Sequence, residues 1–342
     1  MSGRRFRRRV TWMSFILSIL VVWIHAYNAE LFLGTLGAHE AARIAEIWVG
    51  ERIAQIAVPG FFMLSSYLFF RGYTLERLPR KMLRRVWSLL IPYLAWNFLY
   101  YAGYFIGSRI PVFSDMVNKG KVPFSAGELF RAVFLFSFNP VFWFVFQLII
   151  LVAVSPLLYY AVRRADTAVI FLGFVLVLVA FRADLPLVNE DALFYYSAAA
   201  AVACHGRRFI ERRRPERYFT PFLCFFAGAL VLYYVYSRTG NDLPLVLSRF
   251  FGASALWLFL SILPLPAPRP YMYHSFMLYA MHFALVRFIN KAAAVVFSGS
   301  EAAAMIIYLL MPGLMIIIVS LVSSFLKCFL PGLYTILSGG RR

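Results

Sequence analysis

The feature that most constrains this 342-residue chain is a series of long apolar runs separated by short charged segments. Hydrophobic residues make up 62% of the chain and charged residues only 14%, against about 25% in a typical soluble domain. A water-facing surface so poor in charge would aggregate, so the apolar runs must face lipid. The sequence therefore predicts an integral membrane protein.

Ten apolar segments are candidates for membrane-spanning helices. They lie near 10–29, 53–70, 86–107, 132–138 joined to 141–162, 167–181, 192–204, 218–236, 246–264, 271–297 and 303–328. Because a span needs about 20 residues, segments 167–181 and 192–204 must borrow flanking residues. The run 10–29 is too long for a signal peptide and no cleavage site follows closely, so we expect a retained first span. The predicted fold is an all-α polytopic bundle of about ten transmembrane helices.

Charge alternates between the loops. The N-terminus and the 71–85, 163–166 and 205–217 segments are rich in arginine, whereas the opposite loops carry the acidic residues Glu30, Glu40, Glu46, Asp184, Glu190, Asp191 and Asp242. Orientation follows Lys and Arg, so we expect the basic loops and both termini on the cytoplasmic side of the cell membrane. This rule also accounts for most of the net charge of +19, so we expect no nucleic-acid partner.

The sequence predicts no disulfide, no metal site and no division into repeats. Cys204, Cys224 and Cys328 lie in or at the ends of apolar segments and lack metal-ligand spacing, so we expect no disulfide and no metal site. We see no internal repeat or low-complexity linker, and interpret residues 1–342 as a single membrane domain.

The first apolar segment carries a polar stripe. At 100° per residue, its members fall within an arc of about 100°: Thr11, Ser14, Ser18, His25 and Asn28. Polar groups are costly in hydrocarbon, so those found inside a predicted span are candidate functional residues. Asn28 lies one helical turn after His25, a spacing at which it could hydrogen-bond the imidazole ring and fix its tautomer. The alternative is helix–helix packing, since Ser, Asn and His also bond neighbouring helices. For His25 we favour the functional interpretation.

A second histidine, His282, lies deep in a later segment. It shares a helical face with Ser275, seven residues before it. For His282 the functional and packing interpretations stay equally open.

Two further groups are candidate binding residues. Asn139, Trp143 and Gln147 are spaced by four and predict a polar–aromatic face suited to a saccharide. The basic run Arg80, Lys81, Arg84 and Arg85 is suited to the phosphates of a cytoplasmic cofactor. Positive-inside topology explains most such runs and is the favoured interpretation from the residues alone.

Five motifs in order resemble the membrane acyltransferase-3 family, in its smaller O-acetyltransferase branch without an extra soluble domain. They are Val21–Val22–Trp23–Ile24–His25, Phe61–Phe62–Met63–Leu64–Ser65–Ser66–Tyr67–Leu68, the stretch Arg84 to Asn97 containing Leu90–Ile91–Pro92–Tyr93, Trp143–Phe144–Val145–Phe146–Gln147–Leu148, and Ser275 to His282. Two positions depart from the family pattern. The family commonly has Arg or Lys where Ser14 stands, and Gly where Ser66 stands.

The resemblance implies transfer of an acyl group, most often acetyl from acetyl-CoA, to a hydroxyl of a cell-envelope saccharide, exopolysaccharide or glycolipid. In that mechanism Arg80, Lys81, Arg84 and Arg85 hold the phosphates of acyl-CoA. His25 is the general base, Asn28 sets its tautomer, and His282 assists or stabilises the oxyanion. The competing hypothesis is a membrane transporter or exporter of a glycolipid or small solute without acyl-transfer chemistry.

Overall fold

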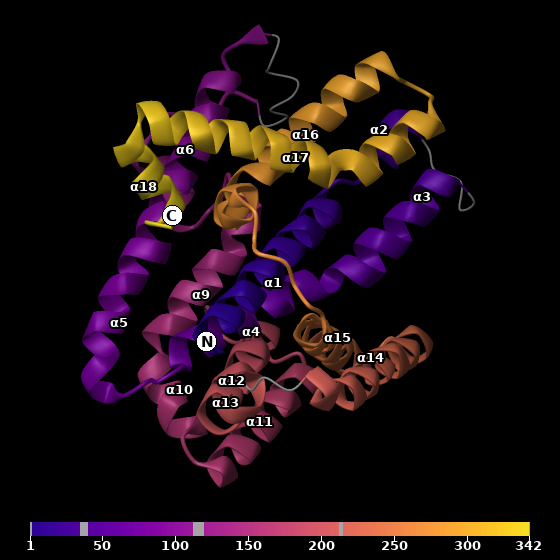
Figure 1. Cartoon of the computed structure of the whole chain (residues 1–342). Coiled ribbons are helices and arrows are strands. Elements are labelled where there is room, and N and C mark those ends of the chain that lie inside the picture. The colour runs from indigo at the N-terminus through magenta and orange to yellow at the C-terminus, as the bar shows by residue number, and fades with distance from the viewer. Residues whose placement is uncertain (1, 35–39, 112–119, 212–214, 342) are drawn as a thin grey trace. The chain divides into compact units, whose positions relative to one another are not determined.

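The computed structural model describes residues 2–34, 40–111, 120–211 and 215–341. Within these ranges the chain is 83% helical and forms no strand, as Figure 1 shows. The all-α prediction is therefore confirmed.

Six helical segments are long and apolar enough to cross a membrane, and a seventh joins them if one bent pair counts as a span. They are Gly3–Leu33, Ala41–Phe70, Leu75–Gly107, Phe219–Thr239, Asp242–Ile262 and Glu301–Phe329, with the pair Pro140–Ala153 and Ser155–Val162 bent by 66°. The protein is thus a multi-pass membrane protein, but the predicted number of ten spans is not confirmed.

The shortfall has physical reasons. Helices α11 (Ala165–Ala180) and α12 (Glu190–His205) have 16 residues each, about 24 Å, which is shorter than a hydrocarbon core of roughly 30 Å. Helix α16 (Ser275–Val296) has 22 residues, but its second half carries Arg287 and Lys291.

Helices also extend into segments that the sequence predicted as loops. The basic segment 71–85 is largely helical, with η3 (Leu75–Arg77) leading into α5 (Leu78–Arg85). The second apolar helix does not begin near 53. It is preceded by α3 (Ala41–Glu46), a π-helix η1 (Ile47–Ile53) and η2 (Ala54–Ile56), so Glu46 lies in a helix and not in a loop.

Contacts group the chain into two compact units, and the first comprises Met1–Leu20, Ala54–Met82 and Gln147–Met272. Its helices include the start of α1 (Ser2–His25), α4 (Ala57–Phe70), α10 (Ser155–Val162), α11, α12, α13 (Arg207–Glu211), α14 (Phe219–Thr239) and α15 (Asp242–Ile262). Helix α4 packs on α12, and α14 runs side by side with α15 (Figure 1). Gly60 of α4 lies against Leu17 of α1, where a Cβ atom would come within 2.8 Å of the leucine side chain.

The second unit comprises Val21–Ile53, Leu83–Phe146 and Tyr273–Arg342. Besides the end of α1, its helices are α2 (Ala29–Leu33), α3, η1, η4 (Val86–Leu90), α6 (Ile91–Gly107), α8 (Ala126–Phe134), η5 (Pro140–Phe142), the start of α9 (Trp143–Ala153), α16, α17 (Glu301–Phe329) and α18 (Pro331–Ser338). A small core joins α2, α3 and α17 through Ala29, Phe32, Ala42 and Ala304. That residues 1–342 form one domain stays a prediction.

Candidate functional site

The candidate site begins where helix α1 ends. His25 is the last residue of α1, and residues 26–28 leave the helix before α2 starts at Ala29. This break is stabilised by the carboxylate of Glu46, which accepts the backbone N–H groups of Asn28 at 2.6 Å and Ala29 at 2.9 Å. A carboxylate is favourable there because the first N–H groups of a helix lack intrahelical partners.

Asn290 of α16 holds the other side of the break. Its Nδ2 donates to the carbonyl of Ala26 at 3.1 Å and is 3.3 Å from that of Tyr27. Glu46 and Asn290 are both almost fully buried. Together they fix the direction in which α1 presents His25.

The second histidine lies beside the first. His282 of α16 is fully buried, and its ring centroid is 5.1 Å from that of His25, with the ring planes at 45°. Phe283 meets His25 edge-on at 5.7 Å. The structure therefore brings together the two histidines that the sequence singled out, across 256 intervening residues.

One hydrogen bond determines the tautomer of His282. Its Nδ1 is 2.6 Å from the carbonyl oxygen of Tyr279, and its buried Nε2 has no hydrogen-bond partner among the described residues. A carbonyl oxygen can only accept, so Nδ1 carries the hydrogen and Nε2 keeps its lone pair. His282 thus offers an acceptor nitrogen in a buried site.

Helix α16 is held in place around His282 by tyrosines. The hydroxyl of Tyr279 donates to the carbonyl of Val141, and the Tyr279 ring stacks on Phe142 with centroids 5.6 Å apart. Tyr100 of α6 donates to the carbonyl of Ala280 at 3.0 Å. These contacts restrain the turn that carries His282.

Comparison with known proteins supplies the observation that decides the family. Residues 8–333 match the model of a family described as an acyltransferase domain. The chain belongs to the membrane acyltransferase-3 family.

A curated relative of this acyltransferase-3 chain is the succinoglycan biosynthesis protein ExoH of Rhizobium meliloti (strain 1021). The two are 27% identical over 251 residues, which is 69% of this chain and 64% of ExoH. The match thus spans less than two thirds of that relative. No solved structure matches the chain.

The two departures from the family pattern have local structural roles. Ser66 is fully buried in α4 and its hydroxyl donates to the carbonyl of Tyr196 in α12 at 2.5 Å, so a serine is accommodated where the family has glycine. The backbone carbonyl of Ser14 accepts the hydroxyl of Ser18 at 2.9 Å.

The structure changes the geometry expected for Asn28. Because α1 ends at His25, Asn28 is not one helical turn further along the stripe. Its Nδ2 donates to Asn290 Oδ1 at 3.4 Å, and its Oδ1 has no partner among the described residues. Asn28 belongs to the break that orients His25, and its direct bond to the imidazole stays a prediction.

Asn139 lies before α9, so the helical spacing that predicted a shared face with Trp143 and Gln147 does not apply to it, and the role of the three residues in saccharide binding stays a prediction. Asn139 precedes η5, is fully buried, and donates to Asn97 Oδ1 at 3.2 Å. Trp143 starts α9 and is 38% exposed. Both ends of the Gln147 amide bind backbone, donating to Leu187 and accepting from Asn189. Gln147 thus anchors the 187–189 segment.

The four expected phosphate ligands differ in their availability. Lys81 donates to the carbonyls of Phe69 and Arg71 at the end of α4, a capping role that occupies its ammonium group. Arg80 and Arg84 are exposed, and Arg85 is half-buried. Their function as acyl-CoA ligands stays a prediction.

Sequence reasoning missed Arg341 at the C-terminus. Its guanidinium lies 4.1 Å from the centroid of the Phe276 ring and donates to the carbonyl of Ser338 at 2.9 Å. Burial, together with the nearby charge of Arg85, lowers the pKa of Arg341 to about 10. Within the described chain no carboxylate pairs with it. No pattern marked this residue, because terminal arginines usually reflect topology alone.

Proposed function

We propose that this protein is a membrane O-acyltransferase that moves an acyl group, which we take to be acetyl, from cytoplasmic acyl-CoA to a hydroxyl of a cell-envelope or exopolysaccharide saccharide. The observation that carries the proposal is the His25–His282 pair, in which one ring is half-buried and its neighbour keeps a buried lone pair. The family and the succinoglycan biosynthesis relative support the reaction class.

In the proposed reaction His25 is the general base. One ring nitrogen takes the proton of the acceptor hydroxyl as its oxygen attacks the thioester carbonyl. The C–O bond forms, the C–S bond breaks, and the leaving thiolate receives the proton from His25. The free enzyme is restored with an ester and CoA as products.

We assign His282 a positioning role. In its tautomer Nε2 has no hydrogen to offer an oxyanion, which argues against the oxyanion role expected from the sequence. Its lone pair is instead suited to accept the remaining N–H of His25 and to stabilise the imidazolium formed during transfer. Ring centroids 5.1 Å apart are compatible with such an N–H···N contact after a small rotation.

Buried polar atoms around the end of α1 support a hydroxyl-rich acceptor. Trp23 Nε1, Tyr27 Oη, Asn28 Oδ1 and Tyr308 Oη are buried and have no hydrogen-bond partner among the described residues. The rings of Tyr27 and Tyr308 are stacked with centroids 6.1 Å apart. Unpaired buried polar atoms are costly, and saccharide hydroxyls would satisfy them.

For the donor we propose Arg84, Arg85 and Arg341 as phosphate ligands. Arg341 lies on Phe276, six residues before His282 on α16, which is about 9 Å along the helix axis. A phosphate group near Arg341 would leave the thioester of an extended pantetheine arm within reach of the histidines.

The central test measures acyl transfer in isolated membranes with radiolabelled acetyl-CoA and envelope polysaccharide. His25→Gln should lower transfer by about 10²–10⁴-fold at normal protein level, because the amide cannot act as a base. His205→Gln is the matched control, since His205 bonds the backbone carbonyl of Val162 and lies outside the proposed site. Substantial transfer by His25→Gln would remove His25 from the mechanism. Absence of labelled polysaccharide with the wild type would favour the transporter hypothesis.

A second prediction concerns the donor. Arg341→Gln and Arg84→Gln should raise the apparent KM for acyl-CoA by roughly tenfold while leaving the KM for the acceptor unchanged, since a phosphate contact contributes to ground-state binding. Arg77→Gln is the control, because Arg77 is exposed in the preceding helix η3 and is not among the expected phosphate ligands, so it distinguishes a specific contact from loss of charge. Unchanged donor kinetics in the Arg341 and Arg84 variants would leave only a topological role for these residues.

A further inference from the structure

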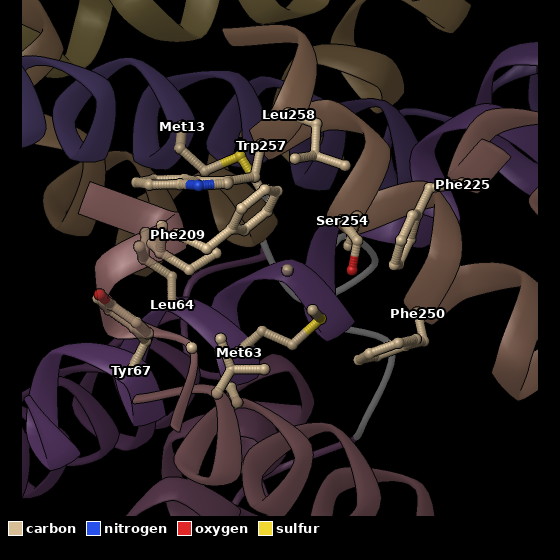
Figure 2. Close-up of a pocket in the computed structure, with 16 residues that line it drawn as sticks. Met13, Met63, Leu64, Tyr67, Phe209, Phe225, Phe250, Ser254, Trp257 and Leu258 are labelled. Carbon is tan, nitrogen blue, oxygen red and sulfur yellow. The ribbon is translucent and has the colours of Figure 1, made fainter. Parts of the chain in front are cut away.

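A cavity of about 300 Å³ lies in the first unit. Its walls come from helices α1, α4, α12, α13, α14 and α15, and Figure 2 shows Met63, Phe209, Phe225 and Phe250 around it. The surface of the cavity is almost entirely apolar, with the Ser254 hydroxyl among its few polar groups. Its volume is at the lower end of the roughly 300–1,000 Å³ of ligand sites, which suits one hydrocarbon chain.

Aromatic rings close one end of this cavity. Tyr67 and Trp257 line it, and Phe6 of α1 contacts both, with ring centroids 5.9 Å from Tyr67 and 5.8 Å from Trp257. Two guanidinium groups lie on these rings: Arg71 is 4.6 Å from the Phe6 centroid, and Arg9 is 5.3 Å from that of Trp257. The apolar cavity therefore ends at a cationic group of residues.

Arg9 is the most informative of these cations. It is only 8% exposed, and its Nη1 donates to the neutral Ser261 hydroxyl at 2.7 Å. No carboxylate pairs with Arg9 in the described ranges. A buried guanidinium without an acidic partner is costly, and an anion would relieve that cost.

Helix α13, which contributes to the cavity wall, also carries positive charge. Phe209 and Ile210 line the cavity, while Arg207 and Arg208 precede them in the same helix. Glu211 is the one carboxylate in this cluster. It pairs with Arg71 at 2.7 Å and Arg207 at 3.0 Å and accepts the Tyr67 hydroxyl at 3.1 Å, which leaves Arg208 exposed and unpaired in the described chain.

We propose that this cavity binds one acyl chain of an anionic phospholipid, whose phosphate lies against Arg9, Arg71 and Arg208. The acyl chain of the lipid makes apolar contacts with the cavity wall, and its phosphate supplies the anion that Arg9 lacks. A zwitterionic lipid fits less well, since its ammonium group would approach the same arginines.

The test reads lipid binding and not acyl transfer, so its failure is distinct from a failure of the proposed function. The full-length protein is reconstituted in phosphatidylcholine vesicles with a minor fraction of phosphatidylglycerol carrying a photoactivatable group in its acyl chain. Cross-linked peptides are then mapped by mass spectrometry. We expect labelling at Met63, Phe209 or Phe225, reduced about tenfold when the probe is a phosphatidylcholine with the same chain.

Substitutions distinguish labelling inside the cavity from labelling of the lipid-facing surface. Ser254→Phe fills the cavity and should abolish its labelling, and Met63→Trp from α4 is a second filling variant should the first express poorly. Val231→Phe on exposed α14 is the matched control and should keep the labelling. Arg208→Gln should reduce it by about tenfold, whereas Arg163→Gln, also exposed, should not.

Three results would overturn the proposal. The first is equal labelling by the phosphatidylcholine and phosphatidylglycerol probes. The second is unchanged cavity labelling in both filling variants. The third is displacement of the lipid probe by acyl-CoA, which would make the cavity a donor site.

Discussion

At the residue scale, the atom opposite a histidine nitrogen decides what that histidine can do. The Tyr279 carbonyl makes Nδ1 of His282 a donor and leaves Nε2 as an acceptor. In contrast, Nε2 of His205 faces the Val162 carbonyl and must carry the hydrogen itself. At His274 the ammonium of Lys327 donates to Nε2 at 3.0 Å, so that nitrogen must accept. Nε2 is therefore an acceptor in His282 and His274 and a donor in His205.

The positioning role of His282 can be tested by two substitutions. His282→Phe should reduce acyl transfer by about 10²-fold, because His25 loses the acceptor that orients it. His282→Gln should recover part of the rate, since its amide oxygen can accept the same N–H. The measurement is kcat at saturating donor. His205→Gln is the control, because His205 bonds the backbone carbonyl of Val162 and has no role in the proposed site. Equal rates for the Phe and Gln variants would contradict the positioning role.

At the element scale, short helices are held by single charged groups. Helix α13 has only five residues and buries none of them, so its attachment to α4 depends on Glu211. Burial alone would raise the pKa of the Glu211 carboxyl, but hydrogen bonds from Arg71, Arg207 and Tyr67 outweigh it and lower the pKa below its ordinary value of 4.5. The ionised carboxylate is therefore the form that stabilises this contact.

The sign of the resulting pH dependence follows from linkage. Because the folded-state pKa is depressed, the stabilisation is fully present above about pH 4.5 and is lost as the pH falls through the lower folded-state value. At pH 7, Glu211→Gln should destabilise the protein by roughly 1 kcal/mol, discounted for partial exposure. Thermal unfolding of purified wild type and variant should show a gap in Tm that narrows only below about pH 4.5. A difference in Tm that does not change with pH would show that the ionised form of Glu211 does not stabilise this contact.

At the scale of the whole molecule, the sequence predicted what depends on composition and missed what depends on packing. Apolar runs and charge alternation predicted an all-helical membrane protein, and motif order predicted the family. His25 and His282 were found because polar residues in apolar runs are rare. Glu46 was taken for a loop residue because its buried role needs the break after α1. Arg9 and Arg341 were hidden because every terminal arginine fits the positive-inside rule.

Orientation is the prediction at this scale that the structure leaves to experiment. In a background without native cysteines, Cys at position 217 should react with an impermeant reagent only after the inner face is opened. Cys at position 241 should react in intact cells, since the two positions flank the candidate span α14 and its loops differ in basic charge. Labelling of position 217 from outside would reverse the proposed orientation.

The exposure of helix α14 determines which amino-acid substitutions this protein can tolerate. None of its 21 residues is buried, so the helix must stay apolar overall, but the exact size and shape of most of its side chains matter little for stability. Two residues are exceptions: a Cβ atom at Gly228 would come within 2.8 Å of Phe251, and Phe225 lines the cavity described above. At its exposed positions one apolar residue can replace another at little cost. The exposed positions of α14 are therefore suited to the attachment of a spectroscopic label.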